Sequence, residues 1–289
     1  MSKQLIHGNY PVNGMQMSFN KNYSLICAFF IQFIPLFVLH FLFKHQYHLA
    51  LQVIVIPIVY LVCGGRWTLN YHNLLHQLSG LNPILDIFLG VGFGHLLSFG
   101  PGKKGHDSHH RINYGENDKR ISLENIEDLS ESDIEYRLNE ILAKDADFWC
   151  KSSLNRWTLF LRSSQFEMNY IQFYLKNVEN AKQKLFPIYM TRLALLLLPY
   201  LFLNPILYSI HLVLCRLVMA LIFMVFTTLS HEKGWFDGFV AKFYPFQKWL
   251  DVNVFLELLI GYHVHHVNEH DNHHTYPKRD VSILANMFE

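Results

Sequence analysis

The stretch Ser24–Phe43, SLICAFFIQFIPLFVLHFLF, decides the fold class, because it contains no charged residue over 20 positions. A helix of about 20 residues is about 30 Å long, which matches the thickness of the hydrocarbon core of a bilayer. Pro35 lies inside the stretch, and membrane helices accept proline where neighbouring groups satisfy the freed carbonyl. The stretch therefore predicts a membrane-spanning helix at 24–43.

Three further apolar stretches extend this prediction along the chain. The runs at 49–70, 187–204 and 205–229 are long enough to span a bilayer, and their order predicts two membrane hairpins. A shorter apolar segment at 84–99 is interrupted by glycine, which favours a re-entrant or interfacial helix. We therefore expect an all-α integral membrane fold with four transmembrane helices.

The rest of the chain is more polar and is predicted to form a helical cap. The cap comprises 71–186 and 230–289, and the whole chain, 1–289, forms one domain. The composition agrees, because 51% of the residues are hydrophobic and only 16% are charged, whereas about 25% are charged in soluble domains. The net charge of +1 provides no basic field for nucleic acid.

Several familiar sites and signals are missing from the sequence. The four cysteines form no CxxC pair, so a disulfide framework and a thiolate zinc site are not expected. The glycine-rich segment 90–105 lacks the Lys followed by Ser or Thr of a phosphate-binding loop. The polar arm 1–20 is not a cleavable signal peptide, because the apolar run after it is too long.

Basic residues indicate which side of the membrane the cap occupies. Two hairpins place both termini and the long middle segment on one side, and nearly all Lys and Arg residues then lie there, whereas Lys44 lies opposite. The positive-inside rule makes the cap side cytoplasmic. Within the spans, Arg192 is expected to snorkel to the surface. Arg216 and His211 are expected to contact another helix, to mark a shifted span boundary, or to act as functional polar groups.

Histidines form the unusual feature of the composition: 18 are present, and most lie in three short clusters. The first cluster is HxxxH at the end of the second apolar run, and the other two are HxxHH. On a helix either pattern places the imidazoles on one face. The last cluster lies in GYHVHHVNEHDNHHTYP (261–277). The nine candidate ligands are His72, His76, His106, His109, His110, His231, His270, His273 and His274.

These nine residues are all expected near the cytoplasmic membrane surface. Neutral imidazole binds iron, zinc or copper strongly, and nine imidazoles suit two metal ions with room for an exchangeable oxygen ligand. His263, His265 and His266 are surplus. His263 and His266 share the main stripe, so either could support a ligand, or His266 could replace His270. His95 is expected to be a packing or interfacial residue.

These histidine clusters and the residues around them resemble the membrane-bound fatty acid desaturase superfamily. The resemblance is carried by HNLLH (72–76), NPILDIFLG (82–90), HDSHHRINYGEND (106–118) and HDNHHTYP (270–277). It implies a mushroom shape, with four membrane helices below a cytosolic cap, and makes the nine histidines ligands of a di-iron centre. The asparagine that some acyl-CoA desaturases place one turn before the ninth histidine is replaced by Thr227.

The resemblance also implies a function. We expect an O2-dependent desaturase with two iron ions, which acts on a fatty acyl chain of a lipid in the bilayer. The same centre could instead hydroxylate or ketolate an acyl chain, a sphingoid lipid or a carotenoid, and a metal transporter is a remote alternative. The sequence has no haem, iron–sulfur or dinucleotide motif, so an external ferredoxin or cytochrome b5-type donor is implied. A bacterial inner membrane is favoured over the endoplasmic reticulum.

Overall fold

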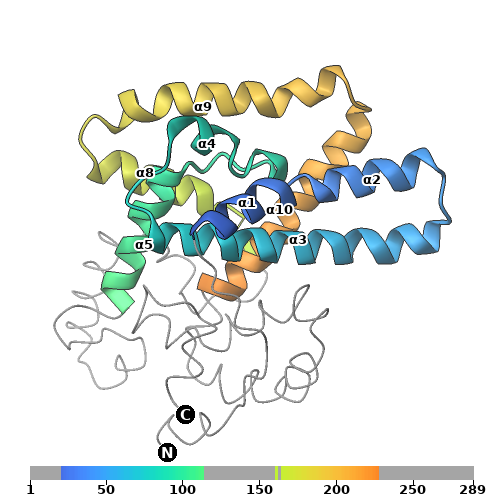
Figure 1. Cartoon of the computed structure of the whole chain (residues 1–289), viewed down its shortest axis with the longest axis horizontal. Helices are drawn as coiled ribbons and strands as arrows, with labels where there is room; N and C mark the ends of the chain where they lie inside the picture. Colours follow the sequence, from blue (N-terminus) through green and yellow to red (C-terminus); the bar gives the residue numbers. More distant parts are fainter. Residues whose placement is uncertain (1–20, 114–159, 162–163, 228–289) are drawn as a thin grey trace, which may run out of the picture.

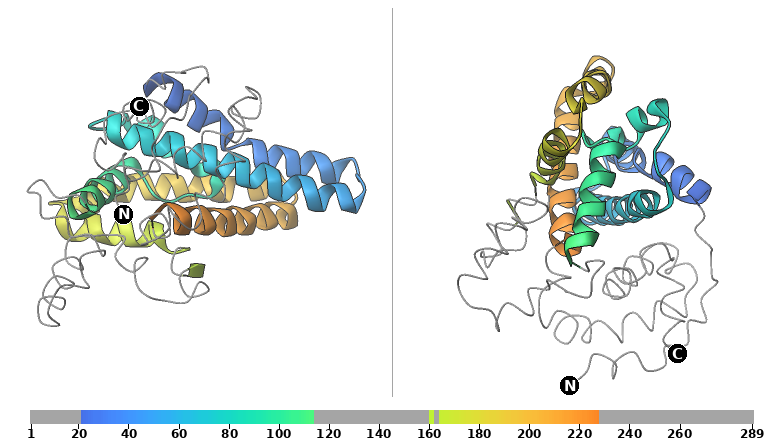
Figure 2. Two further views of the ribbon diagram at one scale, coloured as in Figure 1. Left: turned by 90° about the horizontal axis from the view of Figure 1, so that it is seen from below. Right: turned by 90° about the vertical axis from the view of Figure 1, so that its left-hand side faces the viewer.

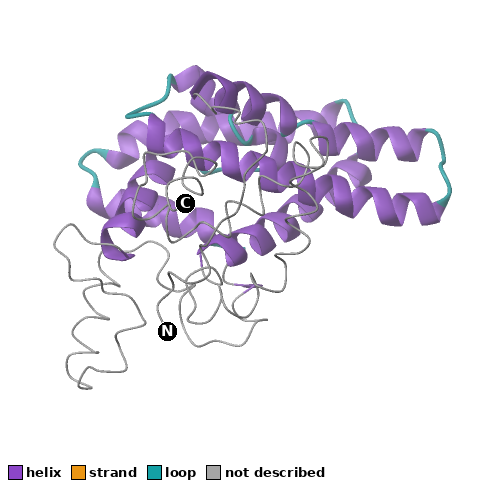
Figure 3. Ribbon diagram, turned by 60° about the horizontal axis from the view of Figure 1, so that its bottom comes forward, coloured by secondary structure: helices purple, strands orange, loops and turns teal. Residues whose placement is uncertain are grey.

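The computed structural model describes residues 21–113, 160–161 and 164–227, without the side chains of 21, 23, 108–113 and 225–227. In these ranges every regular element is a helix (Figure 3). Four helices are long and apolar enough to cross a membrane by length and composition. They are Ser24–Lys44, Leu49–Gln77, Ala181–Leu201 and Pro205–Met224. The predicted all-α fold with four candidate spans is confirmed, and it fits a multi-pass membrane protein.

The first span is broken, where a continuous helix was expected. Helix α1 (Lys21–Ile31) ends before Gln32, and α2 (Ile34–Lys44) carries Pro35 in its first turn. Proline has no amide hydrogen for the carbonyl four residues before it, and its ring collides with that carbonyl. The break therefore lies where Pro35 interrupts the hydrogen bonds of a continuous helix.

The side chain of Gln32, which lies at this break, forms hydrogen bonds with the distant segment 88–92. Its Oε1 accepts hydrogen bonds from the amides of Gly90 at 2.8 Å and Gly92 at 3.0 Å. Its Nε2 donates to the carbonyls of Phe29 at 2.9 Å and Phe88 at 3.1 Å. A Cβ on Gly92 would lie 2.7 Å from the carbonyl oxygen of Gln32, so only glycine permits this approach. Gln32 is fully buried.

Replacing Gln32 with alanine is expected to destabilise the protein by about 1–3 kcal/mol, because buried amides of the 90–92 segment lose their acceptor. Chemical unfolding in detergent, followed by tryptophan fluorescence, measures the change. Gln172→Ala is the control, because Gln172 is exposed on α8 (Phe166–Asn177). Equal stability of the two variants would contradict the role of Gln32.

Helix α3 (Leu49–Gln77) is the longest described helix and continues seven residues beyond the predicted end at 70. His72 and His76 therefore lie within the helix, and the predicted end at 70 is wrong. Hydropathy falls in this last part, but the helix continues because polar Asn70 and Asn73 are buried against neighbours. Both α1 and α2 pack along α3.

Between 83 and 98 the chain forms two short helical elements, where one re-entrant or interfacial helix was expected over 84–99. Helix α4 (Pro83–Phe88) begins at an Asn82 cap, and the 3-10 helix η2 (Val91–Phe93) is flanked by two glycines with positive φ. Both contact α9 (Ala181–Leu197), and Figure 1 shows α4 between α9 and α3. The segment then enters α5 (Phe99–Asn113), which packs against α8.

Helix α9 starts earlier than predicted, at Ala181 instead of Pro187. Asn180 has a left-handed backbone (φ 55°) that sets the start, and Pro187 is accommodated inside the helix. A 3-10 turn, η5 (Leu198–Leu201), leads to α10 (Pro205–Thr227). The predicted end at 229 lies outside the described residues.

The turns between spans lie at one end of the molecule. Figure 1 shows the α2–α3 and α9–α10 connections at the right, and α5 and α8 at the left, next to the last turns of α3. In the end-on view of Figure 2, α9 and α10 lie on one side of the described helices and α1 lies on the other, while α10 also contacts α3. Large apolar side chains such as Phe37, Val53 and Leu201 are exposed on the spans, as expected for surfaces that face lipid.

Candidate metal centre

Three of the predicted ligands converge where α3 meets α5. His72 and His76 are four residues apart in the last turns of α3, so they share one face. His106 reaches them from α5. Ring centroids lie 4.7 Å apart for His72 and His76, 4.4 Å for His72 and His106, and 4.6 Å for His76 and His106. One nitrogen from each ring lies within 4.8 Å of the other two.

The contact between His76 and His106 is compatible with a shared metal ion. Their Nε2 atoms are 2.7 Å apart, so one nitrogen carries the hydrogen that the other accepts. To bind one ion, each imidazole must offer the lone pair of one nitrogen, so a bound cation would take the place of that hydrogen. Because a metal–nitrogen bond is about 2.1 Å long, three nitrogens this close can reach one ion with small side-chain rotations.

The other predicted ligands lie partly or wholly outside the described residues. His109 and His110 are in α5, three and four residues after His106, so the helical repeat places them on the same side of the helix; their side chains are not described. Outside the described residues are His231, His270, His273, His274, His263, His265, His266 and Asp118. The structure thus brings together three of the nine predicted ligands, and the nine-ligand set stays a prediction.

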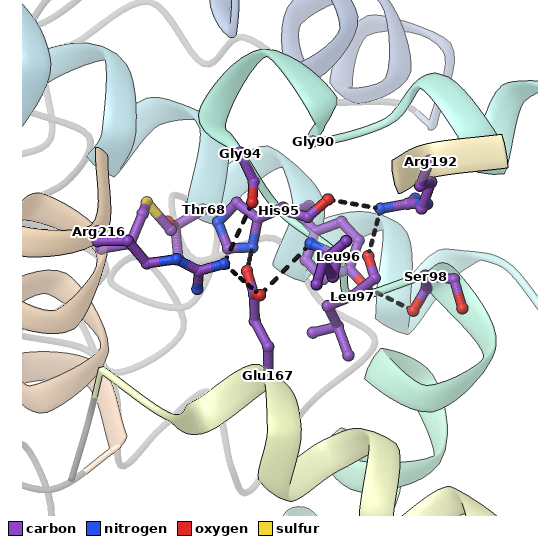
Figure 4. A network of polar contacts seen from close by, with 12 residues as sticks. Thr68, Gly90, Gly94, His95, Leu96, Leu97, Ser98, Glu167, Arg192 and Arg216 are labelled. Atoms are coloured by element: carbon purple, nitrogen blue, oxygen red, sulfur yellow. Dashed lines mark hydrogen bonds and ion pairs between the residues drawn. The ribbon is translucent and has the colours of Figure 1, made fainter. Parts of the chain in front are cut away.

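A second polar network joins His95, Glu167 and Arg216, and the sequence did not indicate most of it. The ring of His95 stacks on Trp67 of α3, with centroids 4.6 Å apart, and its Nδ1 pairs with Glu167 of α8. Glu167 also accepts from Arg216 of α10 at 2.8 Å, and Arg216 donates to the Gly94 carbonyl at 3.2 Å (Figure 4). The expectations that His95 packs internally and that Arg216 contacts another helix are confirmed.

The charges in this network balance. Burial lowers the pKa of His95, so its imidazole is neutral. Burial alone would raise the pKa of Glu167, but the hydrogen bond from His95 and the charge of the Arg216 guanidinium hold that pKa below its usual range. Glu167 is therefore ionised, with Arg216 as its counter-ion and His95 as a neutral donor. A paired charge is tolerated inside a membrane protein, whereas an unpaired one is not.

Arg192 does not snorkel, and that expectation is wrong. Its side chain is fully buried, and its two terminal nitrogens donate to the 86–97 segment (Figure 4). Nη1 reaches the carbonyls of His95 at 3.2 Å and Leu97 at 2.9 Å. Nη2 reaches the Leu89 carbonyl at 2.9 Å, Asp86 Oδ1 at 3.1 Å and the Asp86 carbonyl. The guanidinium of Arg192 finds carbonyl and carboxylate acceptors inside the protein, so it is buried there instead of reaching the surface.

Asp86 links this arginine to the ligand-bearing helix. Its Oδ1 also accepts a 2.7 Å hydrogen bond from the amide of Phe99, the first residue of α5. The first amides of a helix have no partner within the helix, and a carboxylate there satisfies one and favours the helix dipole. Arg192 and Asp86 thereby fix the start of the helix that presents His106.

His211, the other polar residue predicted in a span, is also held by neighbouring elements. Its Nε2 lies 2.9 Å from the Gly92 carbonyl and its Nδ1 lies 2.7 Å from Tyr60 Oη. A carbonyl only accepts, so Nε2 carries the hydrogen and the tyrosine donates to Nδ1. His211 thus joins α10 to α3 and to the 3-10 helix η2, and both ring nitrogens are used within the protein.

Comparisons with protein-family models, with curated proteins and with solved structures give no match. The functional argument therefore depends on the residues and their arrangement.

Proposed function

We propose that this protein is an O2-dependent, membrane-bound di-iron enzyme that introduces a double bond into the fatty acyl chain of a lipid. The observation that supports this best is the meeting of His72, His76 and His106 at one end of a long apolar helix. This arrangement sets a nitrogen-rich metal site next to a surface suited to hydrocarbon. The three histidine boxes extend the same argument to the remaining ligands.

The chain itself would hold the metals and orient the lipid. The three described imidazoles would bind one ion, and the other six candidates would complete a pair. Two bound iron ions would supply activation of O2 and removal of hydrogen from an unactivated C–H bond. Apolar side chains of the spans would bind the acyl chain, since burying each CH2 group contributes about 0.8 kcal/mol.

The proposal includes a partner and a location. An external ferredoxin or cytochrome b5-type protein would deliver electrons. Lys104 is exposed on α5 and available to such an acidic partner, whereas the ammonium of Lys103 is held within the protein. The metal centre would face the cytoplasm, in a bacterial inner membrane.

The test is lipid analysis of a host that supplies reduced donor and expresses either the wild-type chain or His106→Ala. New double bonds are expected only with the wild-type chain. Iron measured in the purified protein is expected at two ions per chain and is expected to fall in the variant. His45→Ala is the matched control, because His45 is exposed in the α2–α3 turn at the far end of α3.

Other outcomes separate the competing functions. Hydroxylated or oxo lipids would favour a hydroxylase or ketolase with the same metal site. Altered metal accumulation with unchanged lipids would favour a transporter. A transporter concentrates ionisable ligands near the middle of its spans, whereas the described histidine group lies in the last turns of α3 and on α5.

A further inference from the structure

Lys103 contacts the immediate chain neighbours of two of the converging histidines. Its Nζ donates to the carbonyl of Leu75 at 2.8 Å and to Asp107 Oδ1 at 2.9 Å. Leu75 directly precedes His76, and Asp107 directly follows His106. One ammonium group therefore joins the end of α3 to the ligand-bearing turn of α5.

The end of α3 is where such a contact matters. The helix ends at Gln77, so His76 is its second-to-last residue. The last four carbonyls of a helix have no partner within the helix, and Leu75 supplies one of them. Helix ends fray because few bonds hold them. A cation that binds a terminal carbonyl satisfies it and interacts favourably with the helix dipole.

We propose that Lys103 is a positioning residue of the metal centre: it caps the last turn of α3 and fixes that turn to α5, so that His76 and His106 stay in reach of one ion. The inference rests on the proposed function. Lys103 touches neither a metal nor a substrate in this scheme, and it acts through the backbone of α3.

The exposure of Lys103 and Asp107 indicates whether loss of Lys103 should change the stability of the fold or its affinity for metal. The side chains of Lys103 and Asp107 are 23% and 39% exposed. Ion pairs this accessible to solvent contribute little to global stability. By contrast, groups that orient metal ligands typically change metal affinity by about 10–100-fold when they are removed. Loss of Lys103 should therefore weaken metal binding while it leaves the fold almost as stable.

The experiment measures cobalt(II) binding to the purified full-length chain in detergent, by competition with a chelator, together with the visible absorption of the bound cobalt. Lys103→Met keeps the length and apolar character of the stem but removes the donor. We expect about tenfold weaker binding and a changed cobalt spectrum. Lys104→Met, an exposed neighbour on the same helix, is expected to bind as the wild type does.

Lys103→Arg tests the mechanism, because arginine can still donate to both acceptors; near-wild-type affinity and spectrum are expected. Equal cobalt affinity of Lys103→Met and Lys104→Met would overturn the inference. A loss of thermal stability in both Lys103→Met and Lys103→Arg would overturn it as well. Failure of the proposed function looks different: the wild type and His106→Ala would then bind cobalt equally, or neither would bind it.

Discussion

Replacing Arg192 with methionine is expected to destabilise the folded protein by about 3–5 kcal/mol, the usual cost of removing one partner of a buried charge pair. The substitution leaves the carboxylate of Asp86 without its cation in a buried site. It also removes the donors that the carbonyls of Leu89, His95 and Leu97 use.

Arg192→Met is also expected to disturb the histidines that would bind metal. Without Arg192, the hydrogen bonds from its guanidinium on α9 to the 86–97 segment are lost. That segment leads directly into α5, whose first amide is bonded to Asp86. Bound metal should therefore decrease together with stability, although Arg192 does not contact a histidine of the group.

Chemical unfolding in detergent, followed by the fluorescence of tryptophan, measures the destabilisation. Lys182→Met is the matched control, because Lys182 is exposed in the first turn of the same helix. Asp86→Asn combined with Arg192→Met should recover part of the loss, since the orphaned charge is then absent. If Arg192→Met is as stable as the control, the buried position of the guanidinium is wrong.

The sequence predicts the spans well because a bilayer imposes a single requirement on them. An apolar run of sufficient length is enough to identify each one, and all four candidate spans were expected. Their ends are less predictable, because hydropathy and helical hydrogen bonding stop at different residues. Helix α3 continues through polar residues to Gln77, and α9 begins at Ala181, before its apolar part.

The buried charges could not be paired from the sequence. Asp86 and Arg192 are 106 residues apart, and Glu167 and Arg216 are 49 residues apart. The available signal was the cost of a charge inside an apolar run. This cost indicates that Arg192 and Arg216 need partners, but it does not identify which residues those partners are. The fold supplies the partners: the 86–97 segment brings Asp86 to Arg192, and α8 brings Glu167 to Arg216.

The histidine group was easier to predict than the residues that bring its two helices together. Imidazoles four residues apart on α3 share a face, so the helical repeat alone predicts that His72 and His76 lie close together. The meeting with His106 depends on how closely α5 approaches α3. That approach is set by residues that carry no ligand chemistry, above all Gly102.

Gly102→Ala is expected to separate α5 from α3 and to disrupt the histidine group. A Cβ at this position would overlap the Tyr71 hydroxyl oxygen and lie 3.1 Å from Tyr71 Cζ. Tyr71 cannot easily yield, because its ring stacks on Trp67 with centroids 5.0 Å apart and its Oη donates to the Ser98 carbonyl at 3.3 Å. Overpacking of this kind costs about 1–3 kcal/mol.

The larger consequence concerns the metal, because Gly102 lies one turn before His106 and Tyr71 directly precedes His72. A displacement at this contact acts on ligands of both helices. Misplacing metal-ligand supports typically weakens metal binding about 10–100-fold. We expect at least the lower value for cobalt in Gly102→Ala, and a matching loss of lipid product if the proposed function holds.

Two further variants make this prediction specific. Gly100→Ala is the control on the same helix, because its Cβ would meet Tyr174 at 3.6 Å, an ordinary contact distance. It should bind cobalt as the wild type does. Adding Tyr71→Phe to Gly102→Ala removes the overlapping oxygen and should restore part of the affinity. If Gly102→Ala binds as Gly100→Ala does, close approach of the two helices does not set the ligand positions. If the double variant is no better than Gly102→Ala, the overlap with Tyr71 is not the cause of the loss.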